Sequence, residues 1–325
     1  MTKYIKVFFL LIAVIFSGAA HKVMGQDPEF SQFYANPLYL NPAFAGTARC
    51  PRISLNYRNQ WPGISGTFIT TSASYDQHVE SLTGGLGLIV TNDQAANTLR
   101  STRVSAIYSY QIKISRKFSI RTGVEATFFQ KSLDWSKLTF GDMIDERRGF
   151  VYQTGDLPRG GTVSGIDFSA GLLGFSDVFF FGFAAHHLSE PNESLINEQS
   201  PLPTKLTGHA GAMIPLSGGA SKYKEDDAMV SPNILFRQQG TFTQLNMGLY
   251  IKKGPLVGGV WYRNKDSFIV LMGIQSDIIR LGYSYDLTVS KLSIATGGAH
   301  EVSLQFNFEC RPKKRSFRTI SCPSF

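Results

Sequence analysis

The chain has 325 residues, a net charge of +8 and only 17% charged residues, against 43% hydrophobic and 13% aromatic residues. Few charges, many aromatic residues and 31 glycines are typical of β-structure with an apolar outer face. Three lysines fall in the first 25 residues and five basic residues in the last 15, so the body between is near neutral. This distribution argues against a nucleic-acid-binding domain.

Residues 1–25 have the pattern of a signal peptide. Lys3 and Lys6 precede an apolar run over 7–19, and the small-residue step before Gln26 offers a cleavage site. An uncleaved membrane anchor is the alternative, but the run is shorter than the roughly 20 residues that a spanning helix needs. No comparable run follows, so a membrane protein with this sequence has to span with β-strands.

Residues 26–50 show little alternation and contain two Asn-Pro steps, which favour turns. We expect this segment to be plug-like, either inside the lumen of a barrel or against its periplasmic mouth. The residues expected to order it are Tyr34, Asn36, Pro37, Asn41, Pro42 and Phe44. The alternative is that they pack without a further role.

Residues 51–308 alternate repeatedly between apolar and polar side chains, which predicts β-strands. The segments are longer than the roughly 5–6 residues of a soluble strand and suit the roughly 9–11 of a membrane strand. Arg, Lys, Gln and Glu on the polar face suit a wet lumen. We therefore predict an all-β transmembrane, antiparallel up-and-down barrel. Its strands are expected at 52–61, 67–79, 85–92, 100–114, 118–131, 165–175, 178–188, 204–215, 228–239, 243–251, 256–264, 267–276, 278–287 and 300–308. Pro232 makes the ninth of these the weakest, because proline removes a ladder donor.

The connections between these strands differ in length. Three turns are very short, at 115–117, 176–177 and 276–277, whereas the links 132–164, 189–203 and 288–299 are long. Outer-membrane barrels have short periplasmic turns and long external loops. We therefore predict a periplasmic N-terminus and C-terminus, with these long links outside. The link 217–227 is an exception, because it is fairly long and falls inside.

No motif for catalysis or for a cofactor is present. His186 and His187 are adjacent in a predicted strand and should point to opposite faces, which disfavours a shared metal ion. Calcium could bind Asp134, Asp142, Asp145 and Glu146, but these residues lack the spacing of a calcium loop, so a solvated loop is the favoured interpretation. We expect no enzyme activity, no metal and no cofactor.

Residues 309–325 form a short basic tail, expected in the periplasm. Cys310 and Cys322 bracket it and are a possible disulfide, which would leave Cys50 unpaired; three free thiols are the alternative. Apolar residues are interleaved with the charges, which suits a bound peptide as well as a solvated end. If the tail docks on an anionic partner, the contacting residues are expected to be Lys313, Lys314, Arg315 and Arg318.

Several segments carry a family resemblance. The chain resembles the PorP/SprF family in three segments: DPEFSQFYANPLYLNPAFAG (27–46), SKLSIATGGAHEVSLQFNF (290–308) and the basic end RPKKRSFRTISCPSF (311–325). Two further stretches also fit, LTFGDMID (138–145) and SPNILFRQQGTFTQLNMGLY (231–250). Members are outer-membrane proteins of type IX secretion and gliding systems in Bacteroidota. The resemblance implies partnership with the periplasmic ring of the secretion machine, or with the C-terminal domain of a secreted surface protein such as a gliding adhesin. It implies no catalytic residues.

The leading hypothesis is thus a non-enzymatic accessory barrel of type IX secretion, integral to the outer membrane and in contact with its lipid. The alternative is an outer-membrane channel or small-solute transporter, since a barrel of this size can enclose a pore. An ordered N-terminal plug would argue against the channel. A hydrolase is a third hypothesis, which the missing nucleophile and base disfavour.

Overall fold

The computed structural model describes residues 26–48, 50–64, 66–115, 118–145, 147–155, 161–195, 199–216, 228–289 and 297–310. The predicted signal peptide and the tail beyond Cys310 lie outside the described residues. Within the described part, no helix is long and apolar enough to cross a membrane.

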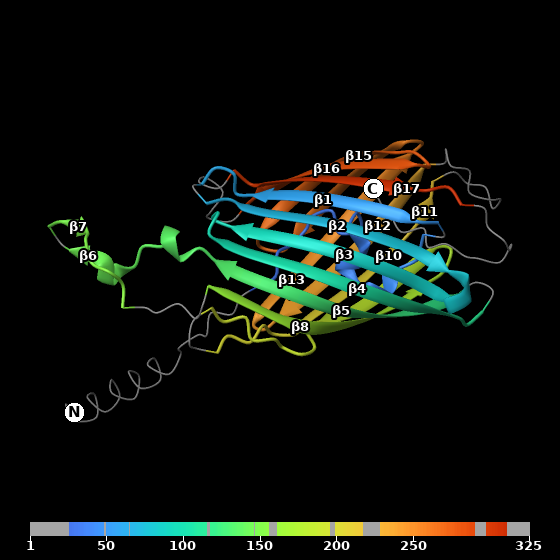
Figure 1. Ribbon diagram of the computed structural model, residues 1–325. Coiled ribbons are helices and arrows are strands. Elements are labelled where there is room, and N and C mark those ends of the chain that lie inside the picture. Colours follow the sequence, from blue (N-terminus) through green and yellow to red (C-terminus); the bar gives the residue numbers. More distant parts are fainter. Residues whose placement is uncertain are drawn as a thin grey trace, which may run out of the picture.

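Fourteen antiparallel strands form a closed barrel, which confirms the predicted fold (Figure 1). Consecutive wall strands are neighbours, β10 pairs with β12, and the first strand pairs with the last. The wall strands are β1 (Arg52–Gln60), β2 (Phe68–Val79), β3 (Gly84–Ala95), β4 (Leu99–Lys113), β5 (Ser119–Leu133), β8 (Thr162–Phe175), β9 (Phe179–His186), β10 (Lys205–Ala212), β12 (Met229–Gln239), β13 (Phe242–Lys253), β14 (Leu256–Arg263), β15 (Ser267–Gln275), β16 (Ile279–Thr288) and β17 (Ala299–Asn307).

Shorter elements lie between and before these strands. They are α2 (Pro37–Leu40), the 3-10 turns η1 (Pro42–Phe44), η2 (Glu80–Leu82), η3 (Trp135–Lys137) and η4 (Gly141–Met143), and the two-residue strands β6 (Ile144–Asp145), β7 (Gly149–Phe150) and β11 (Ile214–Pro215). The hairpin of β6 and β7 belongs to the long connection between β5 and β8, and it extends beyond the rim of the barrel (Figure 1).

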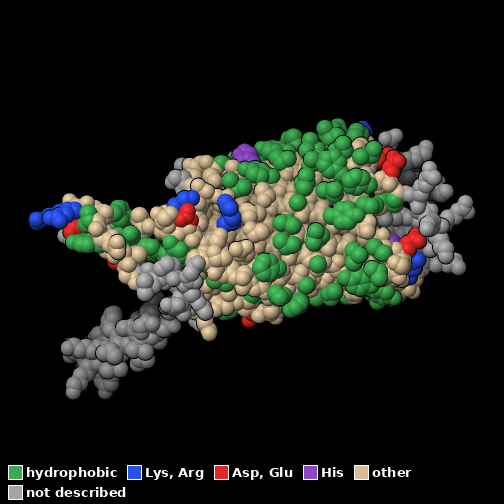
Figure 2. Space-filling model, in the orientation of Figure 1, with side chains coloured by type: hydrophobic (Ala, Val, Ile, Leu, Met, Phe, Trp, Pro, Cys, Tyr) green, Lys and Arg blue, Asp and Glu red, His purple; other side chains and the backbone are tan. Residues whose placement is uncertain are grey.

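The two faces of the wall have opposite chemistry, as the alternation predicts. On β17, Glu301, Ser303 and Gln305 face the interior and are buried, whereas Val302 faces outward. Hydrophobic side chains cover the flank of the barrel, and the charged ones gather near its ends (Figure 2). The outer face therefore suits a lipid environment.

The strand that contains Pro232 is present despite the missing donor. Pro232 faces Leu249 of β13 on one side, and on the other side the ladder to β12 is interrupted between Gly211 and Ile214. At this interruption, the N–H of Met213 donates to the carbonyl oxygen of Val178 at 2.7 Å instead. The pairs on either side of this gap keep the same register, and Pro232 lies within the gap, so the proline breaks little of the ladder.

The predicted short turns and long links lie at opposite ends of the barrel. The connections β4–β5, β8–β9 and β15–β16 form the short-turn end, and β5–β8, β9–β10 and β16–β17 form the long-link end. Cys50 precedes β1 and Cys310 follows β17, so both lie at the short-turn end.

The predicted disulfide between Cys310 and Cys322 is wrong. Cys310 is bonded to Cys50 across a separation of 260 residues. The two residues meet because the first and last strands pair, and the N–H of Phe308 donates to the carbonyl oxygen of Pro51 at 2.9 Å. Barrel closure, and not proximity along the chain, selects the partner.

Candidate functional site

Residues 26–48, here called the lumenal segment, lie inside the barrel (Figure 1). All its apolar side chains from Phe30 to Ala45 except Pro37, Tyr39 and Pro42 are at most 2% exposed. The two Asn-Pro steps start its two short helices, with proline in the first turn of each. Proline is tolerated there because the first helical N–H groups have no partner within the helix.

The six residues expected to order this segment all lie within it, and the two asparagines among them bind the wall. The side-chain amide of Asn36 donates to Ser72 Oγ at 2.6 Å. That of Asn41 donates to the carbonyl oxygens of Leu172 and Phe183 at 3.1 and 3.2 Å. Pro37 and Pro42 begin α2 and η1. These two asparagines thus join the segment to both sides of the wall.

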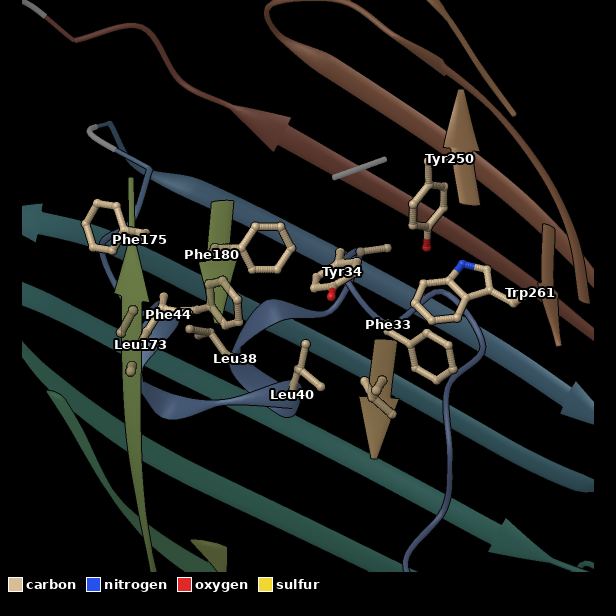
Figure 3. Packing of buried hydrophobic residues seen from close by; sticks show 14 of the residues in the cluster. Phe33, Tyr34, Leu38, Leu40, Phe44, Leu173, Phe175, Phe180, Tyr250 and Trp261 are labelled. Atoms are coloured by element: carbon tan, nitrogen blue, oxygen red, sulfur yellow. The ribbon is translucent and has the colours of Figure 1, made fainter. Parts of the chain in front are cut away.

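The aromatic members of the set belong to a hydrophobic cluster across the lumen (Figure 3). Tyr34 packs edge-on against Phe180 on one side and against Tyr250 on the other, with ring centroids 5.5 and 6.4 Å apart. Phe44 stacks on His209 at 5.4 Å, and Phe33 meets Trp261 at 4.8 Å. The cluster therefore reaches from β9 to β14 through the lumenal segment.

Two inward-facing glycines let the lumenal segment approach the wall, with its backbone at Gly123 and with the Asn41 side chain at Gly171. A β-carbon at Gly123 would lie 2.5 Å from the backbone nitrogen of Ala43, and one at Gly171 would lie 2.0 Å from Asn41 Oδ1. Both distances are far inside van der Waals contact. These positions accept only glycine as long as η1 keeps its place.

Charged groups hold the segment near the short-turn end. The N–H of Gly46 donates to Asp76 Oδ2 at 2.7 Å, and Asp76 is paired with Arg52 at 2.8 Å. The carbonyl oxygen of Ala45 accepts from the guanidinium of Arg121 and from Ser109 Oγ. The buried wall charges are thus directed at backbone groups of the segment.

At the long-link end, a cavity of about 800 Å³ lies above the segment. Charged side chains of both signs line it together with apolar ones, and the charged groups gather around Asp27. Asp27 Oδ2 lies 2.7 Å from His187 Nε2 and also binds Lys205 Nζ, while Asp27 Oδ1 lies 3.7 Å from Arg103. His187 Nδ1 lies 2.6 Å from Asp167 Oδ2. One imidazole therefore bridges the segment and the wall.

Asp27 and His187 both lie outside the wall strands, and each shifts the pKa of the other. Burial favours the neutral Asp27 carboxyl, but His187, Lys205 and Arg103 hold its pKa well below its usual range. Burial likewise disfavours a charged His187, but the Asp27 and Asp167 carboxylates raise its pKa. The arrangement is a buried ion pair with hydrogen bonds on both ring nitrogens.

The position of Gln26 and Asp27 corrects the expected placement of the N-terminal segment. Both line the cavity at the long-link end, whereas Gly46 packs against Gly85 near the short-turn end. The segment runs lengthwise through the barrel. Its beginning therefore lies at the opposite end of the barrel from the start of β1 and from Cys310, whereas the N-terminus and C-terminus were predicted on the same side.

Both histidines of the adjacent pair face the interior, which strand alternation did not predict. β9 ends at His186, and His187 has a left-handed φ of 58°, so the alternation stops between them. They contact different carboxylates: His186 Nδ1 lies 3.8 Å from Glu125 Oε2, and His187 binds Asp27 and Asp167. Over the described residues, no group of three or more His, Cys, Asp or Glu side chains is placed to hold a metal ion.

The remaining predicted site residues, Lys313, Lys314, Arg315, Arg318 and Cys322, lie outside the described part of the chain. Asp27, His187 and the buried wall charges are not among the site residues predicted from the sequence. The wall charges could have been recognised in the sequence, because they occupy positions at which the alternating pattern points the side chain into the barrel.

A family model described as "Type IX secretion system membrane protein PorP/SprF" matches residues 23–306. The chain belongs to this family. The chain matches no curated protein. The PorP/SprF assignment makes it a membrane component of type IX secretion and agrees with the outer-membrane barrel fold.

Solved barrels resemble this PorP/SprF protein only distantly. Omp33 of Acinetobacter baumannii is 7% identical, with a TM-score of 0.45, and the match covers 81% of this chain and 100% of that one. The toluene transporter TbuX of Ralstonia pickettii is 11% identical, with a TM-score of 0.45 and coverage of 84% and 93%. A FadL homologue of Pseudomonas aeruginosa is 12% identical, with a TM-score of 0.43 and coverage of 83% and 93%. Likeness at this level carries no argument about function.

Gly123→Ala should unseat the lumenal segment. The added methyl would meet the backbone of Pro42 and Ala43, so the barrel should lose about 1–3 kcal/mol of stability, as in other overpacked interiors. Urea unfolding in detergent micelles and protease sensitivity of the segment measure this. The matched control is Gly258→Ala, whose β-carbon meets nothing within 4 Å. Equal stability of the two variants would contradict the seating described here.

Asp27→Asn should weaken the attachment of the lumenal segment to the wall at the long-link end. Removing one member of a buried ion cluster costs about 3–5 kcal/mol. The stabilisation from the lowered pKa of Asp27 is fully present above about pH 4 and lost as the pH falls through that lowered pKa. The stabilisation from the raised pKa of His187 is present below about pH 6.5 and lost as the pH rises through that raised pKa.

The difference in unfolding free energy between Asp27→Asn and the unaltered protein should therefore be largest between these limits. Asp93→Asn is the control, because Asp93 lines the same cavity but accepts from Thr70 Oγ1 at 2.7 Å within the wall. A pH-independent difference would argue against the ion pair.

Proposed function

We propose that this protein is a non-enzymatic outer-membrane component of type IX secretion that assists secretion or surface anchoring of a substrate, such as a gliding adhesin. Its action would be to bind and anchor, with no bond made or broken. The observation that carries this proposal is the occupied lumen, taken together with the PorP/SprF family. A barrel whose cross-section is filled by its own chain is suited to hold partners at its ends.

The two ends of the barrel differ in a way that suits two kinds of partner. The long-link end has the charged cavity and the projecting β6–β7 hairpin, and we assign it to the cell surface and to the C-terminal domain of a secreted surface protein. The short-turn end has the Cys50–Cys310 disulfide, from which the basic tail continues. We assign this end to the periplasm and to the ring components of the secretion machine.

The alternative is an outer-membrane channel or small-solute transporter. The cavity at the long-link end favours it, because that space would admit a small solute. The lumenal segment opposes it, because its cluster and its backbone contacts block the path to the short-turn end. Any channel would need the segment to move.

A pull-down from membranes tests the partner assignment. The full chain should co-purify with the C-terminal domain of a secreted surface protein and with periplasmic ring components. Replacing Lys313, Lys314, Arg315 and Arg318 by Gln should release the ring components and keep the secreted protein, because attraction between the tail and an anionic partner is lost. Arg147→Gln with Arg148→Gln, which removes two positive charges at the other end, is the control. Ring components that stay with the tail variant would overturn this assignment.

Swelling of liposomes tests the channel alternative. Vesicles with the unaltered protein should take up small sugars no faster than empty vesicles. A variant with Gly123→Ala and Gly171→Ala, checked first for a folded barrel, should swell faster because its lumenal segment is unseated. Brisk sugar uptake by the unaltered protein would favour the channel over anchoring.

A further inference from the structure

The barrel closes where β1 meets β17, and the lumenal segment lies against this seam. The two strands pair from Arg52 with Asn307 to Gln60 with Ala299, and Cys50 and Cys310 are bonded just beyond them. The inward side chains at the seam include Arg58 of β1 and Glu301 of β17, both buried. Residues 31 and 32 of the segment lie directly on these two side chains.

Glu301 binds backbone groups of the segment. Its two carboxylate oxygens accept from the N–H of Ser31 at 2.6 Å and from the N–H of Gln32 at 3.1 Å. The side chain of Gln32 donates to the carbonyl oxygen of Glu301 at 2.9 Å and accepts from Ser303 Oγ at 2.6 Å. The last strand is thus attached to the segment by four hydrogen bonds over a sequence distance of about 270 residues.

Contacts of the segment with the first two strands are much more local. Arg58 donates to Ser31 Oγ, Asn36 donates to Ser72, and Gly46 donates to Asp76, over separations of 27, 36 and 30 residues. Local contacts form at a lower cost in chain entropy than contacts across the whole chain. The segment can therefore settle on β1 and β2 while β17 is still free.

The lengthwise path of the segment gives an independent argument for this order. Asp27 is at the long-link end and Gly46 is at the short-turn end, with the aromatic cluster between them. If the wall closed first, Phe33, Tyr34 and Phe44 would have to be drawn through a ring of hydrogen-bonded strands. Closure around a segment already in place avoids that step.

We infer that the lumenal segment docks on β1 before the barrel closes, and that Glu301 closes the seam by binding the N–H groups of Ser31 and Gln32. The inner face of the seam is in this sense a binding site for a peptide of the chain itself. It recognises two consecutive backbone N–H groups and the Gln32 amide. Arg58 prepares the site, because it also pairs with Asp286 at 2.9 Å and with Glu301 at 3.4 Å.

The native disulfide reports on closure, because it forms between residues on either side of the seam. The full chain with Cys322→Ser, which leaves two cysteines, is refolded from denaturant into detergent micelles under oxidising conditions. Trapping of free thiols then gives the rate at which Cys50 and Cys310 join. Glu301→Gln should slow this rate roughly tenfold, the size expected for losing hydrogen bonds to a charged acceptor.

Asn41→Ala is the matched control. It removes contacts of the segment with Leu172 and Phe183 on the opposite wall and leaves the seam contacts in place. It should form the disulfide at the unaltered rate, even though its barrel unfolds more easily. Equal slowing by Asn41→Ala, or no slowing by Glu301→Gln, would overturn the inference.

Gel mobility before and after heating shows whether each variant reaches the closed barrel. If Glu301→Gln does not fold, Ser303→Ala decides the question, because it removes a single hydrogen bond to Gln32. Slower disulfide formation in Ser303→Ala than in Asn41→Ala supports closure by the segment. The reverse order of the two rates would exclude it.

Discussion

The structure depends on the filling of a lumen that the wall cannot fill by itself. An eight-stranded barrel is about wide enough for its own side chains, and a wider one encloses space. Here fourteen strands surround residues 26–48, which take up much of that space. The inward glycines of β5 and β8 and the inward aromatic residues of β9, β13 and β14 are complements of this segment. They would have no evident purpose around an open pore.

Buried charge fixes where the segment sits along the barrel axis. Buried charges are paired at three places: Arg58 on the seam with Glu301 and with Asp286 of the adjacent β16, Arg52 with Asp76 near the short-turn end, and Asp27 with His187 at the long-link end. A buried charge without a partner is costly, whereas apolar contacts tolerate sliding. The aromatic cluster therefore holds the lumenal segment against the wall, and the polar contacts at both ends fix the position of the segment along the barrel axis.

Most of the wall was predictable because alternation at period two is a local signal. Even the strand with Pro232 is where the sequence indicates, and the gap in the neighbouring ladder explains how the proline is tolerated. The Cys50–Cys310 bond was not predictable from spacing, because only closure of the barrel brings residues 260 apart together. The pairing of Asp27 with His187 depends on the same closure, and on a left-handed residue where alternation ends.

The lumenal segment also offers a route by which a structural change at one end of the barrel can affect the other end. The segment touches β1, β2 and β17 at the seam, β5 and β8 through η1, and the cavity through Asp27. β1 continues directly from the segment, and the disulfide joins that point to the root of the basic tail. A partner that displaced Asp27 from His187 would thus act on a chain that is covalently continuous with the other end. An effect can therefore pass from one end of the barrel to the other along the lumenal segment, without any solute crossing the lumen. This is consistent with a secretion component whose lumen is occupied by its own chain instead of by water.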